Sequence, residues 1–176
     1  MGHFRRRLIL ATIALFAAAP RALSEVAPEG ALPAPSGPVI LEVSGKISRS
    51  NSPDGKALFD ADMLATFPPQ ELTTATTVTD GVNRFDGILM RDLLNHLGAE
   101  GEVVRAIALN DYVIDIPIED FTAFDVILAH SMDGERLSQR TKGPLWIVYP
   151  RDDHPELDDI RYDYRWVWQL QHIEIR

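Results

Sequence analysis

Cysteine is absent from all 176 residues of the chain, and this absence excludes several kinds of chemistry at once. Without thiols there is no disulfide framework, no cysteine nucleophile, no iron–sulfur cluster and no zinc site built on cysteine. The folded protein must therefore be held together by its hydrophobic core, and the chain is long enough to form one such core.

Basic residues are also scarce, with 17 lysines and arginines against 26 acidic residues, a formal net charge of −9. Nucleic acids and anionic membrane surfaces attract basic proteins, so this balance disfavours both as partners. We expect no nucleic-acid binding, and the acidic excess mainly favours solubility.

The first 24 residues contain the three parts of a secretory signal peptide. Residues 5–7 are consecutive arginines, residues 8–19 form an apolar run, and Ala22 and Ser24 provide a cleavage site of small residues. The apolar run is shorter than the roughly 20 residues that span a bilayer. We therefore expect a periplasmic or secreted protein with no stable membrane insertion after cleavage. The arginine run also fits a twin-arginine signal, so the export route stays open.

Cleavage would change the charge and leave a single folded domain. Four arginines and no acid lie in residues 1–24, so the mature chain would carry 13 basic and 26 acidic residues, a formal charge of −13. Residues 25–38 are rich in proline, alanine and glycine, a composition typical of a flexible linker. We expect the folded domain to occupy residues 39–176.

Apolar patterning within residues 39–176 predicts more strands than helices, with hairpins and helical crossovers mixed. This favours an α+β domain built on a mixed sheet. A helix is expected over residues 89–97, with Gly98 as its C-terminal stop. A shorter helix is expected over residues 59–67. Strands are expected at residues 39–43, 73–79, 104–109, 112–116, 126–129, 146–149 and 166–175.

Several segments in a fixed order carry a family resemblance. They are residues 85–94 (FDGILMRDLL), 108–112 (ALNDY) with 116–117 (IP), 133–137 (DGERL), 143–146 (GPLW), and 165–168 (RWVW) leading to 173–174 (IE). Together they resemble the molybdopterin-binding oxidoreductase (sulfite oxidase-like) family over about residues 40–175. The resemblance implies a single α+β domain with a sulfite oxidase-type molybdopterin-binding fold.

The chain departs from this family where the metal would be bound. In the family, a cysteine just upstream of the first block gives its thiolate to molybdenum, and the matching stretch here is residues 76–81 (TTVTDG). Thr79 and Asp80 lie nearest to the cysteine position. Asp80 has a carboxylate that suits a hard metal, but Asp80–Gly81 is also typical of a turn. We expect no metal site of the family's kind.

The family's phosphate-binding cations are also partly missing. Tryptophans, Trp146 and Trp168, occupy two positions where family members often have basic residues. The resemblance leaves four cations to contact a pterin phosphate, and these candidate cofactor-binding residues are Arg84, Arg140, Lys142 and Arg165. Alternatively, these cations lie on the surface and form ion pairs with the abundant acidic side chains.

Other polar residues give no catalytic pattern. His96, His130 and His172 are scattered without a triad or metal-ligand spacing, so hydrolase chemistry is unsupported and catalytic residues stay unassigned. The acidic stretch at residues 152–159 is expected to be a solvated loop. Trp166 and Trp168 would share one face of a strand, where we expect both to be buried, unless they line a vacated groove.

Three functions remain open on this basis. The first is an exported binding module without molybdenum, which binds a small ligand or a periplasmic protein partner in the vacated cofactor groove. The alternative is a molybdopterin-dependent oxidoreductase whose metal has a ligand other than cysteine. The third is a sensory or accessory protein that acts on a membrane partner.

Overall fold

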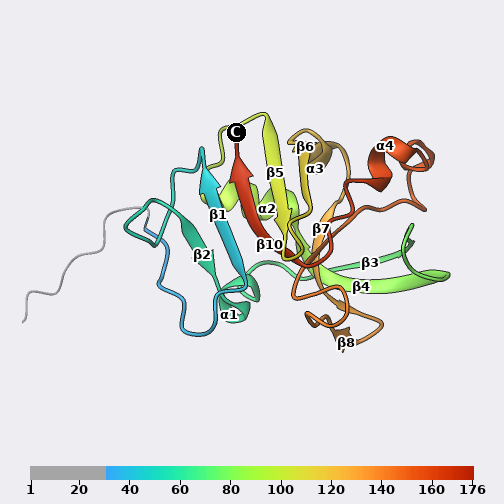
Figure 1. Ribbon diagram of the computed structural model, residues 1–176, viewed down its shortest axis with the longest axis horizontal. Helices are drawn as coiled ribbons and strands as arrows, with labels where there is room; N and C mark the ends of the chain where they lie inside the picture. Colours follow the sequence, from blue (N-terminus) through green and yellow to red (C-terminus); the bar gives the residue numbers. More distant parts are fainter. Residues whose placement is uncertain (1–30) are drawn as a thin grey trace, which may run out of the picture.

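The computed structural model describes residues 31–176, whose strands form two five-stranded sheets (Figure 1). The expected signal peptide and residues 25–30 of the expected linker lie outside the described residues. The first sheet has the order β2-β1-β10-β5-β6, with β1 and β10 parallel and its other neighbours antiparallel. Its strands are β1 (Leu41–Gly45), β2 (Ala57–Phe59), β5 (Val103–Ala108), β6 (Val113–Pro117) and β10 (Leu170–Ile175).

The first sheet has one apolar face and one polar face because its side chains alternate. In β1, Leu41 and Val43 are fully buried, whereas Glu42 and Ser44 lie on the partly exposed face. β5 repeats the pattern, since Val104 is buried and its neighbour Val103 is partly exposed. The apolar face packs toward the core, where α2 (Met90–Leu97) lies behind the sheet in Figure 1.

The second sheet has the order β3-β4-β7-β8, and β9 also pairs with β7. Its strands are β3 (Gln70–Ala75), β4 (Val82–Leu89), β7 (Ile127–Met132), β8 (Glu135–Arg136) and β9 (Trp146–Val148). Gly87 allows β4 and β7 to approach closely, since a Cβ atom there would lie 2.3 Å from the carbonyl oxygen of Leu128. One mixed sheet, one antiparallel sheet and a few small helices confirm the predicted α+β class.

The helices are short, and α2 is the longest of those in residues 31–176. Met90, Leu93, Leu94 and Leu97 form its buried face, and Gly98 ends it in the left-handed conformation at φ 58°, as the sequence predicted. The others are α1 (Ala61–Leu64), α3 (Asp120–Ala123), a 3-10 helix (Pro155–Leu157) and α4 (Ile160–Asp163). Within the described chain, none of the helices has the length and apolar character needed to cross a bilayer.

Residues 31–38 pack against the domain, which differs from the flexible linker expected over residues 25–38. Leu32 is 6% exposed, and its backbone N–H donates to the carbonyl of Ser50 at 3.1 Å. The backbone N–H groups of Ser36 and Gly37 donate to the Asp60 carboxylate at 2.6 and 2.7 Å. One apolar side chain and one buried carboxylate thus hold a segment whose composition alone indicates a linker.

Candidate functional site

A cavity of about 290 Å³ lies where three parts of the fold meet. Its walls come from the β3–β4 turn, the β5–β6 hairpin and the segment that follows α4. In Figure 1, the tip of the β3–β4 hairpin lies below α4 at the right of the view. The lining residues are Thr77, Val78, Asn110, Tyr112, Asp163, Tyr164, Trp166 and Trp168. The cavity therefore borders the turn where the family's cysteine was expected.

The β3–β4 turn is held in shape by its own hydroxyl groups. The hydroxyls of Thr76 and Thr79 lie 2.7 Å apart, and the backbone N–H of Val78 donates to Thr76 Oγ1 at 3.2 Å. The Asp152 carboxylate accepts a hydrogen bond from the backbone N–H of Ala75 at 2.9 Å, which fixes the end of β3. Thr77 and Val78 line the cavity from this turn, whereas Asp80, named from the sequence, is exposed.

The second wall is the loop between β5 and β6, which the sequence predicted as a hairpin around Asn110 and Asp111. Asp111 has φ 63°, the left-handed conformation that such a tight turn requires. Tyr112 donates its hydroxyl to the backbone carbonyl of Tyr164 at 2.7 Å, which ties the hairpin to the third wall. Burial, with a smaller contribution from Tyr164, raises the pKa of Tyr112, so this phenol stays neutral.

The third wall carries two tryptophans that differ in exposure. Trp166 is 1% exposed, and its ring centre lies 5.9 Å from that of Tyr149 at an interplanar angle of 43°, whereas Trp168 is only partly buried. The expectation that both would be buried is therefore wrong for Trp168. β10 begins only at Leu170, because Gln169 has φ 53° and interrupts the extended strand expected from residue 166. Both indoles nevertheless border the same cavity.

Asp163 brings a carboxylate to this otherwise aromatic wall. Its Oδ1 atom is buried and has no hydrogen-bond partner among residues 31–176. The pKa of Arg151 is raised chiefly by its hydrogen bond to Asp158, and the charge of Asp163 adds to this effect. The nearby guanidinium is thus directed to Asp158. Like Asp163, Trp166 has a buried polar atom without a hydrogen-bond partner in the described chain, its indole Nε1–H.

The four cations predicted from the sequence do not gather at this cavity, and no lysine or arginine of residues 31–176 lines it. Arg165 forms an ion pair with buried Asp120 at 2.5 Å. Arg84 lies 3.9 Å from both Glu71 and Asp86 on the second sheet, and Arg140 is exposed.

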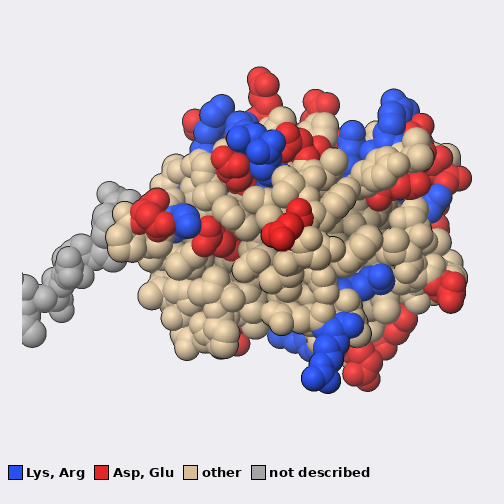
Figure 2. Space-filling model, viewed as in Figure 1, with Lys and Arg blue, Asp and Glu red and all other residues tan. Residues whose placement is uncertain are grey.

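Lys142 contacts the ring of Trp168, one of the residues that line the cavity. Its Nζ atom is 4.8 Å from the centre of the Trp168 ring and 5.5 Å from that of Trp146. On the face shown in Figure 2, basic and acidic side chains are interspersed, with no broad basic patch.

Four of the lining residues were not predicted from the sequence as site residues, namely Asn110, Tyr112, Asp163 and Tyr164. These side chains come from segments more than 50 residues apart, so local spacing could not place them together. The only sequence signal was the concentration of aromatic residues at 162–168 (YDYRWVW). In residues 31–176, no three histidine, aspartate or glutamate side chains are placed to hold a metal ion.

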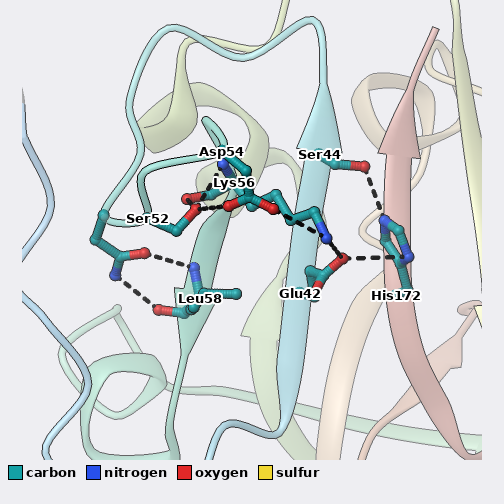
Figure 3. Close-up of polar contacts among 8 residues, drawn as sticks. Glu42, Ser44, Ser52, Asp54, Lys56, Leu58 and His172 are labelled. Carbon is teal, nitrogen blue, oxygen red and sulfur yellow. Dashed lines mark hydrogen bonds and ion pairs between the residues drawn. The ribbon is translucent and has the colours of Figure 1, made fainter.

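A second polar cluster lies on the exposed face of the first sheet (Figure 3). Ser44 Oγ is 2.8 Å from His172 Nε2, and Glu42 Oε1 lies 3.6 Å from His172 Nδ1 and 2.9 Å from Lys56 Nζ. The order serine–histidine–acid resembles a hydrolase triad, which was not predicted from the sequence. Ser44, however, lies within a strand, where the ladder engages backbone amides that an oxyanion would need. We assign the cluster to cross-strand pairing.

Comparisons with known proteins agree with the fold. The family model described as "Oxidoreductase molybdopterin binding domain" matches residues 61–152, slightly more than half of the chain. The sulfane dehydrogenase SoxCD from Paracoccus pantotrophus has a similar structure, with a TM-score of 0.59 and 18% sequence identity. The match covers 77% of this chain and 37% of the SoxCD chain. Among curated proteins, none matches the chain significantly.

Proposed function

The chain belongs to the family of oxidoreductase molybdopterin-binding domains, and from this premise we propose that it is an exported binding module that works without molybdenum. It keeps the family scaffold and uses the aromatic cavity beside the β3–β4 turn to hold a small ligand. The observation that carries this proposal is the composition of the cavity, in which four aromatic side chains stand beside the β3–β4 turn. This is the turn where the resemblance to the family leads us to expect the metal ligand.

The residues at the turn do not suit a molybdenum centre of the family's kind. The chain has no thiolate to offer, since it contains no cysteine. Thr79, near the position of the family's ligand, already shares a hydrogen bond with Thr76, and threonine hydroxyls are not ionised near neutral pH. Asp80 could offer a carboxylate, but it is exposed at the tip of the turn and does not line the cavity.

The cavity does not suit the phosphate of a pterin cofactor either. A dianionic phosphate is bound by arginine forks, lysines and backbone amides. Of the described residues that line this cavity, none is basic and Asp163 is acidic. Arg165 is already engaged by Asp120. The ligand is therefore expected to be a different kind of molecule.

The size of the cavity favours a small ligand over a protein partner as its occupant. Ligand-binding pockets in proteins begin at about 300 Å³ and are mostly apolar with a few polar groups. The cavity here has about 290 Å³, aromatic walls and three polar side chains, which are Thr77, Asn110 and Asp163. We expect the protein to act in the periplasm or outside the cell, because residues 1–24 have the pattern of a signal peptide.

The test is a cofactor assay on protein exported by its own signal from a host supplied with molybdenum. We expect neither molybdenum nor pterin above background. A cysteine-containing member of the family, expressed and assayed in parallel, establishes that the host supplies the cofactor. Stoichiometric molybdopterin in the purified protein would overturn the proposal. It would favour instead an oxidoreductase in which Thr79 or Asp80 approaches the metal.

A further inference from the structure

The cavity beside α4 combines aromatic walls with a single negative charge. Tyr112, Tyr164, Trp166 and Trp168 provide the aromatic surface, and Asp163 provides the carboxylate. The face of an aromatic ring carries negative partial charge, so such rings attract cations, and tryptophan attracts them best. The rings and the carboxylate are therefore complementary to a cation, and they would repel an anion.

Lys142 gives an example of this attraction within the molecule. Its ammonium nitrogen lies 4.8 Å from the centre of the Trp168 ring, within the distance of about 6 Å that cation–π contacts require. The indole of Trp168 thus already holds one protonated amine. Trp168 also borders the cavity, where Tyr112 and Tyr164 provide further rings.

Asp163 determines which cation fits best. Its buried Oδ1 lacks a hydrogen-bond donor among the described residues, and a buried carboxylate oxygen without a donor destabilises the fold. A primary ammonium has N–H groups that can donate to the carboxylate of Asp163, which lines the cavity, whereas a quaternary ammonium has none. The carboxylate therefore selects an amine with N–H groups over a permanently alkylated one.

The volume of the cavity limits the rest of the ligand. An apolar cavity of about 150 Å³ holds a benzene molecule in another protein. About 290 Å³ therefore accommodates one aromatic ring with a short aminoalkyl arm. Tyr164 and Tyr112 are 57% and 38% exposed, so an entering ligand meets aromatic surface at the rim before it reaches Asp163.

From these observations we propose that the cavity binds a protonated primary amine attached to a compact aromatic or apolar body. The ring would pack against Trp168, and the ammonium would donate a hydrogen bond to the Asp163 carboxylate. This inference rests on the proposed function, because the same cavity cannot at once hold a pterin cofactor.

In the experiment, the protein exported by its own signal is titrated with three probes. Tryptophan fluorescence and calorimetry measure the binding of each probe. Phenethylamine has both the charge and the N–H groups, 2-phenylethanol lacks the charge, and phenethyltrimethylammonium lacks the N–H groups. We expect phenethylamine to bind at least about tenfold more tightly than either analogue, which corresponds to about 1.4 kcal/mol. Equal binding of 2-phenylethanol, or no binding of phenethylamine, would overturn the inference.

A variant pair tests the role of Asp163. Asp163→Asn removes the charge at nearly constant shape and should weaken phenethylamine binding about tenfold or more. Asp153→Asn makes the same charge change at an exposed position outside the cavity and should leave binding unchanged. Thermal melting of both variants verifies folding. Unchanged binding in a folded Asp163→Asn variant would contradict the inference.

The two proposals fail in different ways. A protein that is free of molybdopterin and does not bind the amine contradicts only the amine inference. A protein that carries stoichiometric molybdopterin contradicts the proposed function, and the amine inference with it.

Discussion

At the scale of single residues, Trp166 and Trp168 stand two positions apart and border one cavity, yet their environments differ. Trp166 is enclosed and packs against the tilted ring of Tyr149, whereas Lys142 covers one side of Trp168 and that ring stays partly exposed. A side chain that fills the core contributes to stability through packing, and one at a cavity wall remains available to a ligand.

This difference predicts unequal effects of two alanine substitutions. Trp166→Ala should lower the free energy of unfolding by about 3–5 kcal/mol because it leaves a cavity in the core. Trp168→Ala should cost about 1 kcal/mol, a typical value for a less buried position. Urea unfolding measures both values. Iodide quenching of the Trp166→Phe and Trp168→Phe variants should show that most accessible fluorescence comes from Trp168. Similar losses of stability for the two alanine variants would contradict the assignment.

At the scale of elements, Asp60 joins two segments. Its carboxylate caps α1 by accepting the backbone N–H of Met63 at 2.8 Å, and it also accepts the N–H groups of Ser36 and Gly37. These hydrogen bonds, that from Met63 first, lower the pKa of Asp60 from 3.8 to about 2. The helix start and residues 31–38 therefore depend on one ionised carboxylate.

The lowered pKa of Asp60 predicts a specific acid sensitivity. Because folding lowers the pKa, the ionised form stabilises the fold. This contribution is complete above about pH 4 and is lost as the pH falls through about 2. Asp60→Asn should be less stable than the parent at pH 6, and the difference should shrink between pH 4 and pH 2. Urea midpoints across this range measure it, with Asp62→Asn, exposed on the same helix, as the control. A difference that stays constant with pH would refute this account.

The elements that the sequence predicted are those that local patterns determine. The β5–β6 hairpin around Asn110 and the helix that ends at Gly98 both appear where spacing and turn residues indicate. The expected linker differed because the partner of residues 36 and 37 is Asp60, more than 20 residues away. The site differed for the same reason, since no local period relates Tyr112 to Tyr164.

At the scale of the whole molecule, a buried ion pair connects structure from both sheets. Asp120 begins α3, which follows β6 of the first sheet, and Tyr149 follows β9 of the second. The Asp120 carboxylate accepts hydrogen bonds from Tyr149 at 2.8 Å and from Arg165 at 2.5 Å. Burial, together with the charge of Asp120, raises the pKa of Tyr149 well above its ordinary value, so Tyr149 remains a donor. The sequence had suggested Arg165 as a phosphate ligand, but the structure shows it engaged with Asp120.

Removal of Arg165 should therefore weaken the entire fold. Arg165→Met leaves the Asp120 carboxylate buried without its counter-charge, a change that typically costs about 3–5 kcal/mol. Arg161→Met, which breaks the exposed pair with Asp159, should cost less than about 1 kcal/mol. Chemical unfolding followed by circular dichroism gives both values. Equal, small losses for the two variants would show that the buried pair has no special role in stability.

The parallel pairing of β1 with β10 has a consequence for how the protein is made. β10 fills the centre of the first sheet, between β1 and β5, yet it is the last of the ten strands of residues 31–176 to be synthesised. Ser44 meets His172 only after 128 further residues have been synthesised. Until then β1 and β5 each present an unpaired strand edge, the kind of surface that templates aggregation. The first sheet therefore cannot be completed until residues 170–175 have been synthesised, long after β1 and β5 have emerged.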